Sequence, residues 1–488
     1  MKSLSAGFVV LVVLSGCSSA EDAGPAAKGR PPGPAAGVVG LLDGGQGIRL
    51  GSANEQALPK GWVQEEYALE GRAISYTSED SLPADGVLEL AKAQSADYRT
   101  RVVVRRPGAA EDFNGTVVVE WLNVSGGVDA NPDYSYLADE LHRGGYAWVG
   151  VSAQYIGIEG GPVLVSTPLS EESGAGVGLR ALDPERYGEL HHPGDAFAYD
   201  IYTQIARTLR AAGDSGVLGG LVPSRLLAVG ESQSAFMLTT YVNGVQPLAR
   251  QFDGFLIHSR GRSGAPLGEA GSGINLVSSI TGSSMRIRAD LDVPVMVLQS
   301  ETDMLFMLDY FSSRQPDTGL FRSWEMAGTA HADAYLLGDI SALFECGAPI
   351  NAGPQHFIAK AALGHLDAWV RGEGSPPKSE LLAIDGSGSA PKFVRDADGI
   401  VLGGIRTPLV DVPVDVLSGE PAGGSIACTL FGSTTPLSAA RLAELYASPQ
   451  AYLDAYAESA ANAIAAGFVL EGEKAALLAA AAPARVAP

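Results

Sequence analysis

Short apolar runs alternate along the chain with segments whose apolar positions recur every three or four residues. Residues 116–124, 146–152 and 293–300 are rich in β-branched and other apolar residues, as expected for strands buried on both faces of a parallel sheet. Residues 195–212 instead have apolar positions at helical spacing. This alternation predicts an α/β fold, with a mostly parallel central sheet covered by helices on both faces and joined by right-handed crossovers.

Further segments extend this series. Residues 67–77 and 96–106 have extended patterns, and we expect them to form an antiparallel edge of the sheet. Residues 154–194 are rich in Gly, Pro and Ser without a clear period, and with residues 261–290 they predict irregular connections that shape a pocket. The other expected strands are 226–229, 252–258 and 320–326, the other expected helices are 133–143, 355–370, 439–447 and 452–466, and 393–402 predicts a hairpin.

The segment 226–241 has the pattern of a strand, a sharp turn and a helix, and its turn reads Gly230-Glu231-Ser232-Gln233-Ser234. A turn of this kind lifts the middle serine clear of both elements, and it needs very small residues two positions to either side, because the backbones crowd there. Gly230 and Ser234 meet that need, although the strict Gly-x-Ser-x-Gly motif has a second glycine. Ser232 is therefore a candidate nucleophile.

Candidate partners for this serine follow two later strands. Glu301 and Asp303 come directly after one strand, and His331 follows the next. The carboxyl ends of parallel strands share one edge of the sheet, where ligand sites lie. A serine nucleophile needs an imidazole to take its proton and an anion to hold that imidazole in the right tautomer. His331 is then the candidate general base, and Asp303 or Glu301 is the candidate acid.

The order serine, acid, histidine is that of the α/β-hydrolases, and the chain resembles this superfamily, in particular the bacterial alpha/beta hydrolase domain-containing proteins. The resemblance implies the α/β-hydrolase fold, with insertions and a C-terminal extension, and a serine hydrolase activity without a fixed substrate. It also favours Asp303, which matches the superfamily's usual acid position, while Glu301 stays possible. The matching stretches are residues 120–127, 230–235, 253–261, 328–333 and 404–408.

Two backbone N–H groups are expected to bind the oxyanion that forms during acyl transfer. One belongs to Gln233, at the positive end of the helix after the nucleophile. The other comes from the turn after Asn123, where Val124 and Ser125 are the candidates. Neither fits a strict His-Gly-Gly-Gly pattern. The choice between these two residues stays open.

The N-terminus has the pattern of an export signal. Lys2 precedes an apolar run over residues 4–14 that is too short to span a bilayer. The run ends in Leu14-Ser15-Gly16-Cys17, which resembles the bacterial lipoprotein signal box. The resemblance implies that residues 1–16 are removed and that Cys17 is lipidated, and it favours the outer membrane or cell surface of the envelope. Residues 17–37, rich in Ala, Gly and Pro, predict a flexible tether.

Cys346 and Cys428 are the two remaining cysteines, and an exported protein folds in an oxidising compartment. We therefore expect them to form a disulfide, which would stabilise the fold by on the order of 4 kcal/mol in the loop-entropy model. Apolar residues make up 46% of the chain and charged residues 18%, as in ordinary globular proteins. The net charge of -22 argues against a nucleic-acid surface and against a basic face for anionic lipid.

These observations predict an exported, lipid-anchored serine hydrolase that cleaves a small-molecule carboxylic ester through an acyl-enzyme. The alternatives are an amidase, peptidase or lactonase with the same triad, and a non-catalytic envelope lipoprotein. No cofactor or metal is expected, because the adjacent His191 and His192 lack the spacing of metal ligands. Residues 38–372 are expected to form the core and residues 373–488 an extension packed on it. The sequence does not indicate the oligomeric state.

Overall fold

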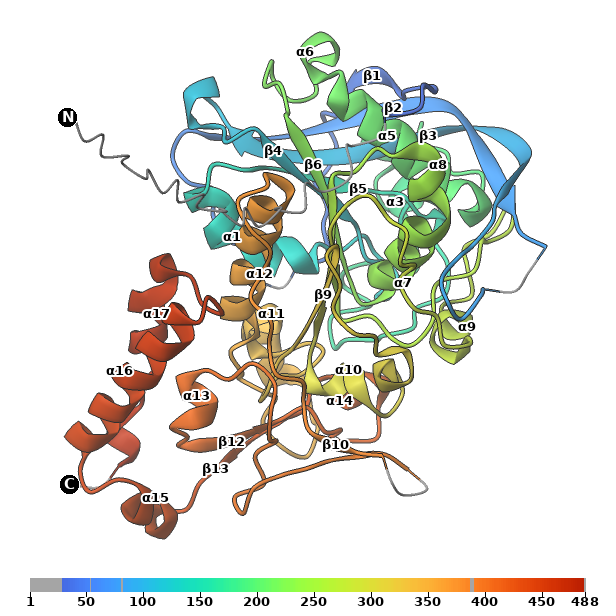
Figure 1. The fold of residues 1–488 in the computed structure, drawn as a ribbon. Helices are drawn as coiled ribbons and strands as arrows, with labels where there is room; N and C mark the ends of the chain where they lie inside the picture. The colour runs from blue at the N-terminus through green and yellow to red at the C-terminus, as the bar shows by residue number, and fades with distance from the viewer. Residues whose placement is uncertain (1–28, 53, 80–81, 387–389, 487–488) are drawn as a thin grey trace, which may run out of the picture.

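The computed structural model describes residues 29–52, 54–79, 82–386 and 390–486 (Figure 1). Within these residues one large sheet has nine strands in the order β1-β2-β3-β5-β4-β6-β7-β8-β9. From β5 to β9 in this order neighbouring strands are parallel, and β2 and β3 form the predicted antiparallel edge, to which β1 adds a further antiparallel strand. The strands are β1 Gly37–Leu41, β2 Trp62–Thr77, β3 Ala91–Pro107, β4 Thr116–Trp121, β5 Ala147–Val151, β6 Arg225–Glu231, β7 Gly254–His258, β8 Val295–Gln299 and β9 Phe321–Glu325.

Helices pack on both faces of this sheet, which confirms the predicted α/β architecture (Figure 1). Val117 and Val119 of β4 belong to one apolar core with the buried residues of α5 and α7. Val118, between them, belongs to a second core with α1 and α12. Successive side chains of a strand point to opposite faces, so an unbroken apolar run suits a strand covered on both sides. These helices are α1 Pro132–Arg143, α5 Ala198–Arg210, α7 Gln233–Thr240 and α12 Gln355–Val370.

The parallel register brings the carboxyl ends of the strands together at one edge. Glu231 at the end of β6 is paired with His258 at the end of β7. Gln299 of β8 is likewise paired with Glu325 of β9. The loops that leave β4, β6, β8 and β9 therefore start from the same edge. Short helices in the loops that leave β8 and β9 are α10 Glu301–Met304 and α11 Ala334–Leu337, whereas α6 Ala212–Ser215 and α8 Gln246–Ala249 precede β6 and β7.

The two long connections contain little regular structure, as their sequences suggested. The first holds α2 Tyr155–Glu159, α3 Leu179–Leu182 and α4 Pro184–Tyr187, and the second holds α9 Leu276–Thr281. The first connection is partly buried: Tyr187 and Leu190 belong to a small apolar cluster with Ala68 of β2. Burial of this kind fixes a connection against the sheet edge.

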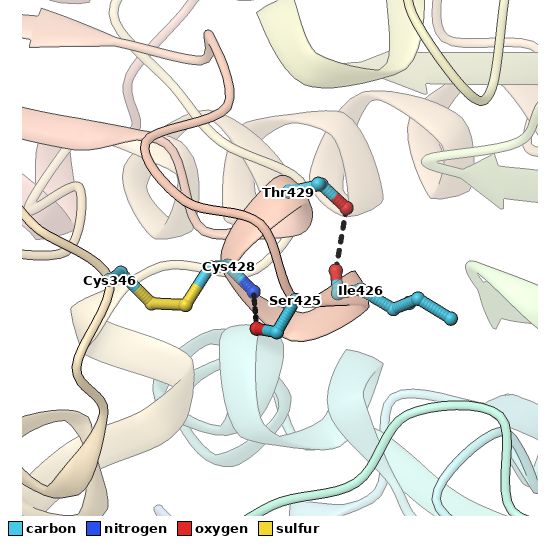
Figure 2. Close-up of a disulfide and its surroundings, with 5 residues drawn as sticks. All are labelled: Cys346, Ser425, Ile426, Cys428 and Thr429. Atoms are coloured by element: carbon cyan, nitrogen blue, oxygen red, sulfur yellow. Dashed lines mark hydrogen bonds between the residues drawn. A yellow bond between two sulfur atoms is a disulfide. The ribbon is translucent and has the colours of Figure 1, made fainter.

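The C-terminal extension packs beside the sheet (Figure 1). The predicted hairpin is reduced to a bridge between Arg395 and Val401, and the two predicted helices are present as α15 and α16. The predicted disulfide joins Cys346 to Cys428 with a Cα–Cα distance of 5.3 Å (Figure 2). The elements of the extension are β10 Ile384–Asp385, β11 Lys392–Phe393, α13 Pro408–Asp411, β12 Asp415–Ser418, α14 Ile426–Leu430, β13 Ser433–Pro436, α15 Ala439–Leu445, α16 Pro449–Ala465 and α17 Lys474–Ala479.

The expected tether ends earlier than the sequence indicated. Its described part packs against α5: Ala36 is buried, its backbone N–H donates to Gln204, and its carbonyl accepts from Thr208. These contacts satisfy the backbone groups just before β1 and hold them on the fold. The expected signal segment and Cys17 lie outside the described residues. Among the helices of the described residues, none has both the length and the hydropathy that crossing a membrane requires.

Candidate active site

Ser232 occupies the turn between β6 and α7 with a backbone φ of 58°. This left-handed conformation is costly for a residue with a side chain, and it persists because β6 and α7 are both fixed by packing. A Cβ atom added at Gly230 would lie 3.0 Å from Ser234 Cβ and 3.0 Å from Leu238 Cδ1. The crowding explains the small residues on either side of Ser232. The turn thus presents the Ser232 hydroxyl above the sheet edge.

A continuous chain of hydrogen bonds starts at this hydroxyl. Ser232 Oγ lies 2.7 Å from His331 Nε2, and His331 Nδ1 lies 2.6 Å from Asp303 Oδ1. A carboxylate can only accept here, so Nδ1 carries the proton and Nε2 is free to accept from the serine. Asp303 is fully buried and His331 is 3% exposed, so water does not compete for these bonds. The structure brings together these three predicted residues.

Asp303 is held in place by its own helix. It is the third residue of α10, and its Oδ2 accepts hydrogen bonds from the Ser300 backbone N–H at 2.6 Å and from Ser300 Oγ at 2.8 Å. This is a capping box, in which the N-cap residue and the third helical residue satisfy each other's groups. One carboxylate oxygen is thereby fixed, and the other points at His331.

Glu301, the alternative acid, is turned away from His331. Its carboxylate accepts from the backbone N–H groups of Gly328 at 2.6 Å and Gly419 at 3.1 Å, and it lies 3.3 Å from the Arg395 guanidinium. Burial raises the pKa of Glu301, while Arg395 and the two N–H groups lower it. The expectation of Glu301 as triad acid is therefore wrong: this carboxylate joins the ends of two strands to the C-terminal extension.

The groups expected to form the oxyanion hole lie next to Ser232. Gln233 is the first residue of α7, so its N–H has no partner within the helix. Its side-chain oxygen accepts from the Val124 N–H at 3.3 Å, which places that donor beside the nucleophile turn. The Ser125 N–H donates to Asn123 Oδ1 at 2.8 Å. Val124 therefore has the longer hydrogen bond of the two candidates and is the easier donor to redirect toward an oxyanion.

Glu231 is a site residue to which sequence reasoning gave no role. Its side chain is buried, and its Oε1, which has no hydrogen-bond partner among the described residues, lies 3.4 Å from His331 Nε2. Burial, with the charges of Asp133 and Asp303, raises the pKa of Glu231 well above its ordinary value. The sequence did carry a signal for Glu231. It directly precedes Ser232, and the last residue of the strand before the turn lies at the edge of the sheet where the site forms.

A cavity of about 330 Å³ opens in front of Ser232 and His331. Its walls are mainly apolar, and they come from segments far apart in the sequence. The first long connection provides Val165 and Leu169, and the C-terminal extension provides Leu430 and Phe431. Sequence reasoning missed the contribution of the extension, because no motif marks these residues. A cavity of this size suits a small organic molecule.

His258 and His192 are buried and lie outside the hydrogen-bonded chain of Ser232, His331 and Asp303. His258 is fully buried, and its Nδ1 lies 2.8 Å from Asp133 Oδ1. Burial lowers the pKa of His192, whose Nε2 lies 2.9 Å from the carbonyl oxygen of Ala153. In the described part of the chain, no group of three or more His, Cys, Asp or Glu side chains is arranged to hold a metal ion.

The chain has similarities both to solved structures and to a family of proteins. Among solved structures, the chain is similar to a fungal esterase from Rhizomucor miehei, with 10% identity over 63% of this chain and 85% of that chain and a TM-score of 0.32. It is also similar to a putative dienelactone hydrolase from Klebsiella pneumoniae subsp. pneumoniae MGH 78578, with 14% identity over 62% of this chain and 98% of that chain and a TM-score of 0.30. No curated protein matches the chain. The family model of the alpha/beta hydrolase domain matches residues 30–479, and the chain therefore belongs to the alpha/beta hydrolase family.

Proposed function

We propose that this protein is a serine hydrolase that cleaves a carboxylic ester through an acyl-enzyme. The observation that carries the proposal is the chain of hydrogen bonds from Ser232 through His331 to Asp303, at the mouth of an apolar cavity. A serine hydroxyl is a weak nucleophile by itself, and an imidazole at 2.7 Å can take its proton as it attacks. The hydrolase family of the chain supports this proposal.

Acylation uses each of these groups. Ser232 Oγ attacks the ester carbonyl carbon while its proton moves to His331 Nε2. The carbonyl oxygen becomes an oxyanion, which accepts from the Gln233 N–H and from the Val124 N–H. His331 then passes the proton to the ester oxygen, and the bond between that oxygen and the carbonyl carbon breaks. Asp303 holds the Nδ1–H and stabilises the imidazolium that forms between these steps.

Deacylation repeats the sequence with water as the nucleophile. His331 Nε2 takes one proton from the water as its oxygen attacks the acyl carbon. The second tetrahedral oxyanion collapses, Ser232 leaves with the proton from His331, and the carboxylic acid is released. The mostly apolar cavity wall favours an apolar substrate.

A fluorophosphonate probe tests the proposal directly, because it reacts only with an activated serine. We expect covalent labelling of the purified protein, and its loss in Ser232→Ala and in His331→Ala. Ser234→Ala is a matched control, because Ser234 Oγ is buried and lies outside the hydrogen-bonded chain. Wild-type protein that resists the probe and hydrolyses no ester would favour a non-catalytic binding role. Hydrolysis of amides or lactones alone would change the substrate class and keep the same three residues.

We also propose that the protein is exported and anchored to the cell envelope through lipid on Cys17. The disulfide between Cys346 and Cys428 supports export, because such bonds persist in oxidising compartments. The test is metabolic labelling with an alkyne fatty acid in a bacterial host that processes lipoproteins. We expect the label in the wild-type protein and its loss in Cys17→Ser. Equal labelling of both proteins, or none of either, would contradict the anchor.

A further inference from the structure

Ser232 and His331 line two cavities of very different size. The larger one measures about 330 Å³ and the smaller one about 20 Å³. An ester bound to Ser232 has two arms that diverge from the carbonyl carbon, one on the acyl side and one on the alcohol side. Two cavities that meet at the reacting atoms therefore receive one arm each.

The small cavity has room for about one water molecule or methyl group, because a cavity needs on the order of 10–15 Å³ to hold a single water. Its walls are mostly apolar side chains from separate parts of the chain. Phe236 comes from α7, Ile280 from α9, and Ile426 and Leu430 come from α14 of the C-terminal extension. An arm longer than one carbon atom exceeds this volume and would crowd at least one of these walls.

The wall formed by α14 is fixed from several sides (Figure 2). The disulfide from Cys346 holds Cys428, which lies between Ile426 and Leu430 in the helix. The Ser425 side chain caps the helix by accepting from the Cys428 N–H at 3.1 Å. Displacing this wall would require breaking these constraints.

The end of α14 is also tied to the loop of the candidate base. The carbonyl oxygen of Leu430 accepts from the Ala332 N–H at 3.2 Å, directly after His331. The Phe431 carbonyl likewise accepts from the Asn351 N–H at 3.1 Å. A shift of the α14 backbone would therefore disturb the loop that carries His331, whereas truncation of a wall side chain would not break these backbone hydrogen bonds.

We infer that the substrates are esters with one short arm, a single carbon beyond the ester group, and one bulky apolar arm. Ile426 and Leu430 of the extension set the limit on the short arm. This inference rests on the proposed ester hydrolysis at Ser232 and names the class of substrate for that site. It makes the C-terminal extension a determinant of specificity as well as a part of the fold.

Two ester series test the inference and identify the short arm. The first contains 1-naphthyl acetate, butyrate and octanoate, and the second contains the methyl, butyl and octyl esters of 1-naphthoic acid. We expect kcat/KM to fall by at least about tenfold from the one-carbon arm to the longer arms in one series, because a hydrophobic pocket discriminates about 10–200-fold per methylene. If the one-carbon member of the 1-naphthyl series is hydrolysed, the acyl arm is the short one. If the methyl ester of 1-naphthoic acid is hydrolysed instead, the alcohol arm is the short one. Equal kcat/KM along both series would overturn the inference.

Enlarging the small cavity gives the second test. Ile426 is 43% exposed, so Ile426→Ala removes a cavity wall at little risk to folding, and Ile280→Ala removes a second wall. We expect each variant to raise the ratio of kcat/KM for the longer arm over the one-carbon arm by about tenfold. Val277→Ala, a 51% exposed residue on the same helix as Ile280 and outside both cavities, should leave the ratio unchanged.

The outcomes separate this inference from the proposed function. Ratios in Ile426→Ala and Ile280→Ala that match the wild-type ratio would overturn the assigned wall, while labelling of Ser232 would still support the hydrolase. Failure of the wild-type protein both to react with a fluorophosphonate and to hydrolyse any member of either series would overturn the proposed function itself.

Discussion

Asp303 and Glu301 are buried carboxylates two positions apart, and their hydrogen bonds give them different roles. Asp303 faces His331, and Glu301 faces Gly328, Gly419 and Arg395. We expect Asp303→Asn to lower kcat by roughly 10³–10⁴-fold, because an amide no longer holds His331 in the right tautomer. We expect Glu301→Gln to keep kcat within a few-fold and to lower the free energy of unfolding by about 1–3 kcal/mol.

Steady-state kinetics and urea unfolding of both variants measure these effects. The two substitutions are matched, since each replaces a buried carboxylate by the amide of the same shape. Near-normal turnover in Asp303→Asn together with a large loss in Glu301→Gln would show that the acid has been assigned to the wrong residue.

Glu231 is a buried acid beside the candidate base His331. Burial and the charges of Asp133 and Asp303 raise its pKa, so the group is neutral at pH values where an ordinary glutamate is ionised. It gains its negative charge only as the pH rises through this raised pKa, 3.4 Å from His331 Nε2 and beside Ser232. A charge there opposes the oxyanion of the transition state. We therefore expect wild-type kcat/KM to fall as the pH rises through this raised pKa, and kcat/KM of Glu231→Gln to keep its plateau.

The measurement is the pH profile of kcat/KM with one short-arm ester for both proteins. At acidic pH the two profiles should share one limb, since neutral glutamic acid and glutamine have similar shape and no charge. Profiles that coincide at every pH would show that Glu231 does not ionise in the working range or does not affect the reaction.

The sequence could place the main site residues but not choose among them. The turn motif identified Ser232, and the ends of two later strands identified His331 and the pair Glu301 and Asp303. The choice between the two acids depends on α10: its first turn directs Asp303 inward, and Glu301 finds partners at Gly419 and Arg395, about a hundred positions away. The sequence around Glu301 does not indicate such distant contacts. Likewise, no local pattern marks Leu430 as part of the cavity wall.

At the scale of elements, buried strands were easier to predict than edge strands. The runs that form β4, β5 and β8 are apolar on both faces, so their own composition determines their structure. β1, β12 and β13 were not predicted. β1 has exposed and half-exposed residues only and forms because β2 offers a free edge, while β12 and β13 form by pairing with each other. Such strands form because a pairing partner exists elsewhere in the chain, and the pattern within a short segment does not reveal that partner.

The helix α14 is the element whose stability depends most on one covalent bond. The disulfide closes a loop with a sequence separation of 82 residues. The chain-entropy model gives about 4 kcal/mol for a loop of this length. We expect Cys346→Ser/Cys428→Ser to lower the free energy of unfolding by up to about this amount, and to widen the small cavity by releasing Ile426. Urea unfolding and the ratio of kcat/KM for long-arm and short-arm esters measure the two effects.

Reduction of the wild-type protein provides the control for this pair of substitutions. A reductant should lower the stability of the wild-type protein to that of the double variant and should leave the variant itself unchanged. Wild-type stability that is insensitive to reductant, with no change in the ratio of the ester rates, would show that α14 is held by its noncovalent contacts alone.

At the scale of the whole molecule, the C-terminal extension completes the sheet. β9 is the last strand of the sheet, and Ile405 lies beside it in a parallel bridge to Met326. The Ile405 N–H donates to Glu325 at 2.7 Å, and its carbonyl accepts from Ala327 at 3.0 Å. The Trp324 indole donates to the Pro377 carbonyl at 2.9 Å. These contacts cover backbone groups that an uncovered edge would offer to other chains.

The extension therefore belongs to the folding unit of the hydrolase, and damage to its contact with β9 should act on the whole protein. Ile405 is 1% exposed, whereas Leu402, three positions earlier, is 40% exposed. We expect Ile405→Asp to give aggregated protein or a Tm lower by 5 °C or more, since an unpaired charge buried beside the edge strand costs several kcal/mol and about 1 kcal/mol shifts Tm by roughly 2–4 °C in large domains. Leu402→Asp introduces the same charge at the surface and should change neither soluble yield nor Tm.

Deletion of residues 373–488 should have the same effect as Ile405→Asp. A soluble, fluorophosphonate-reactive chain ending at residue 372 would show instead that the core folds without its extension.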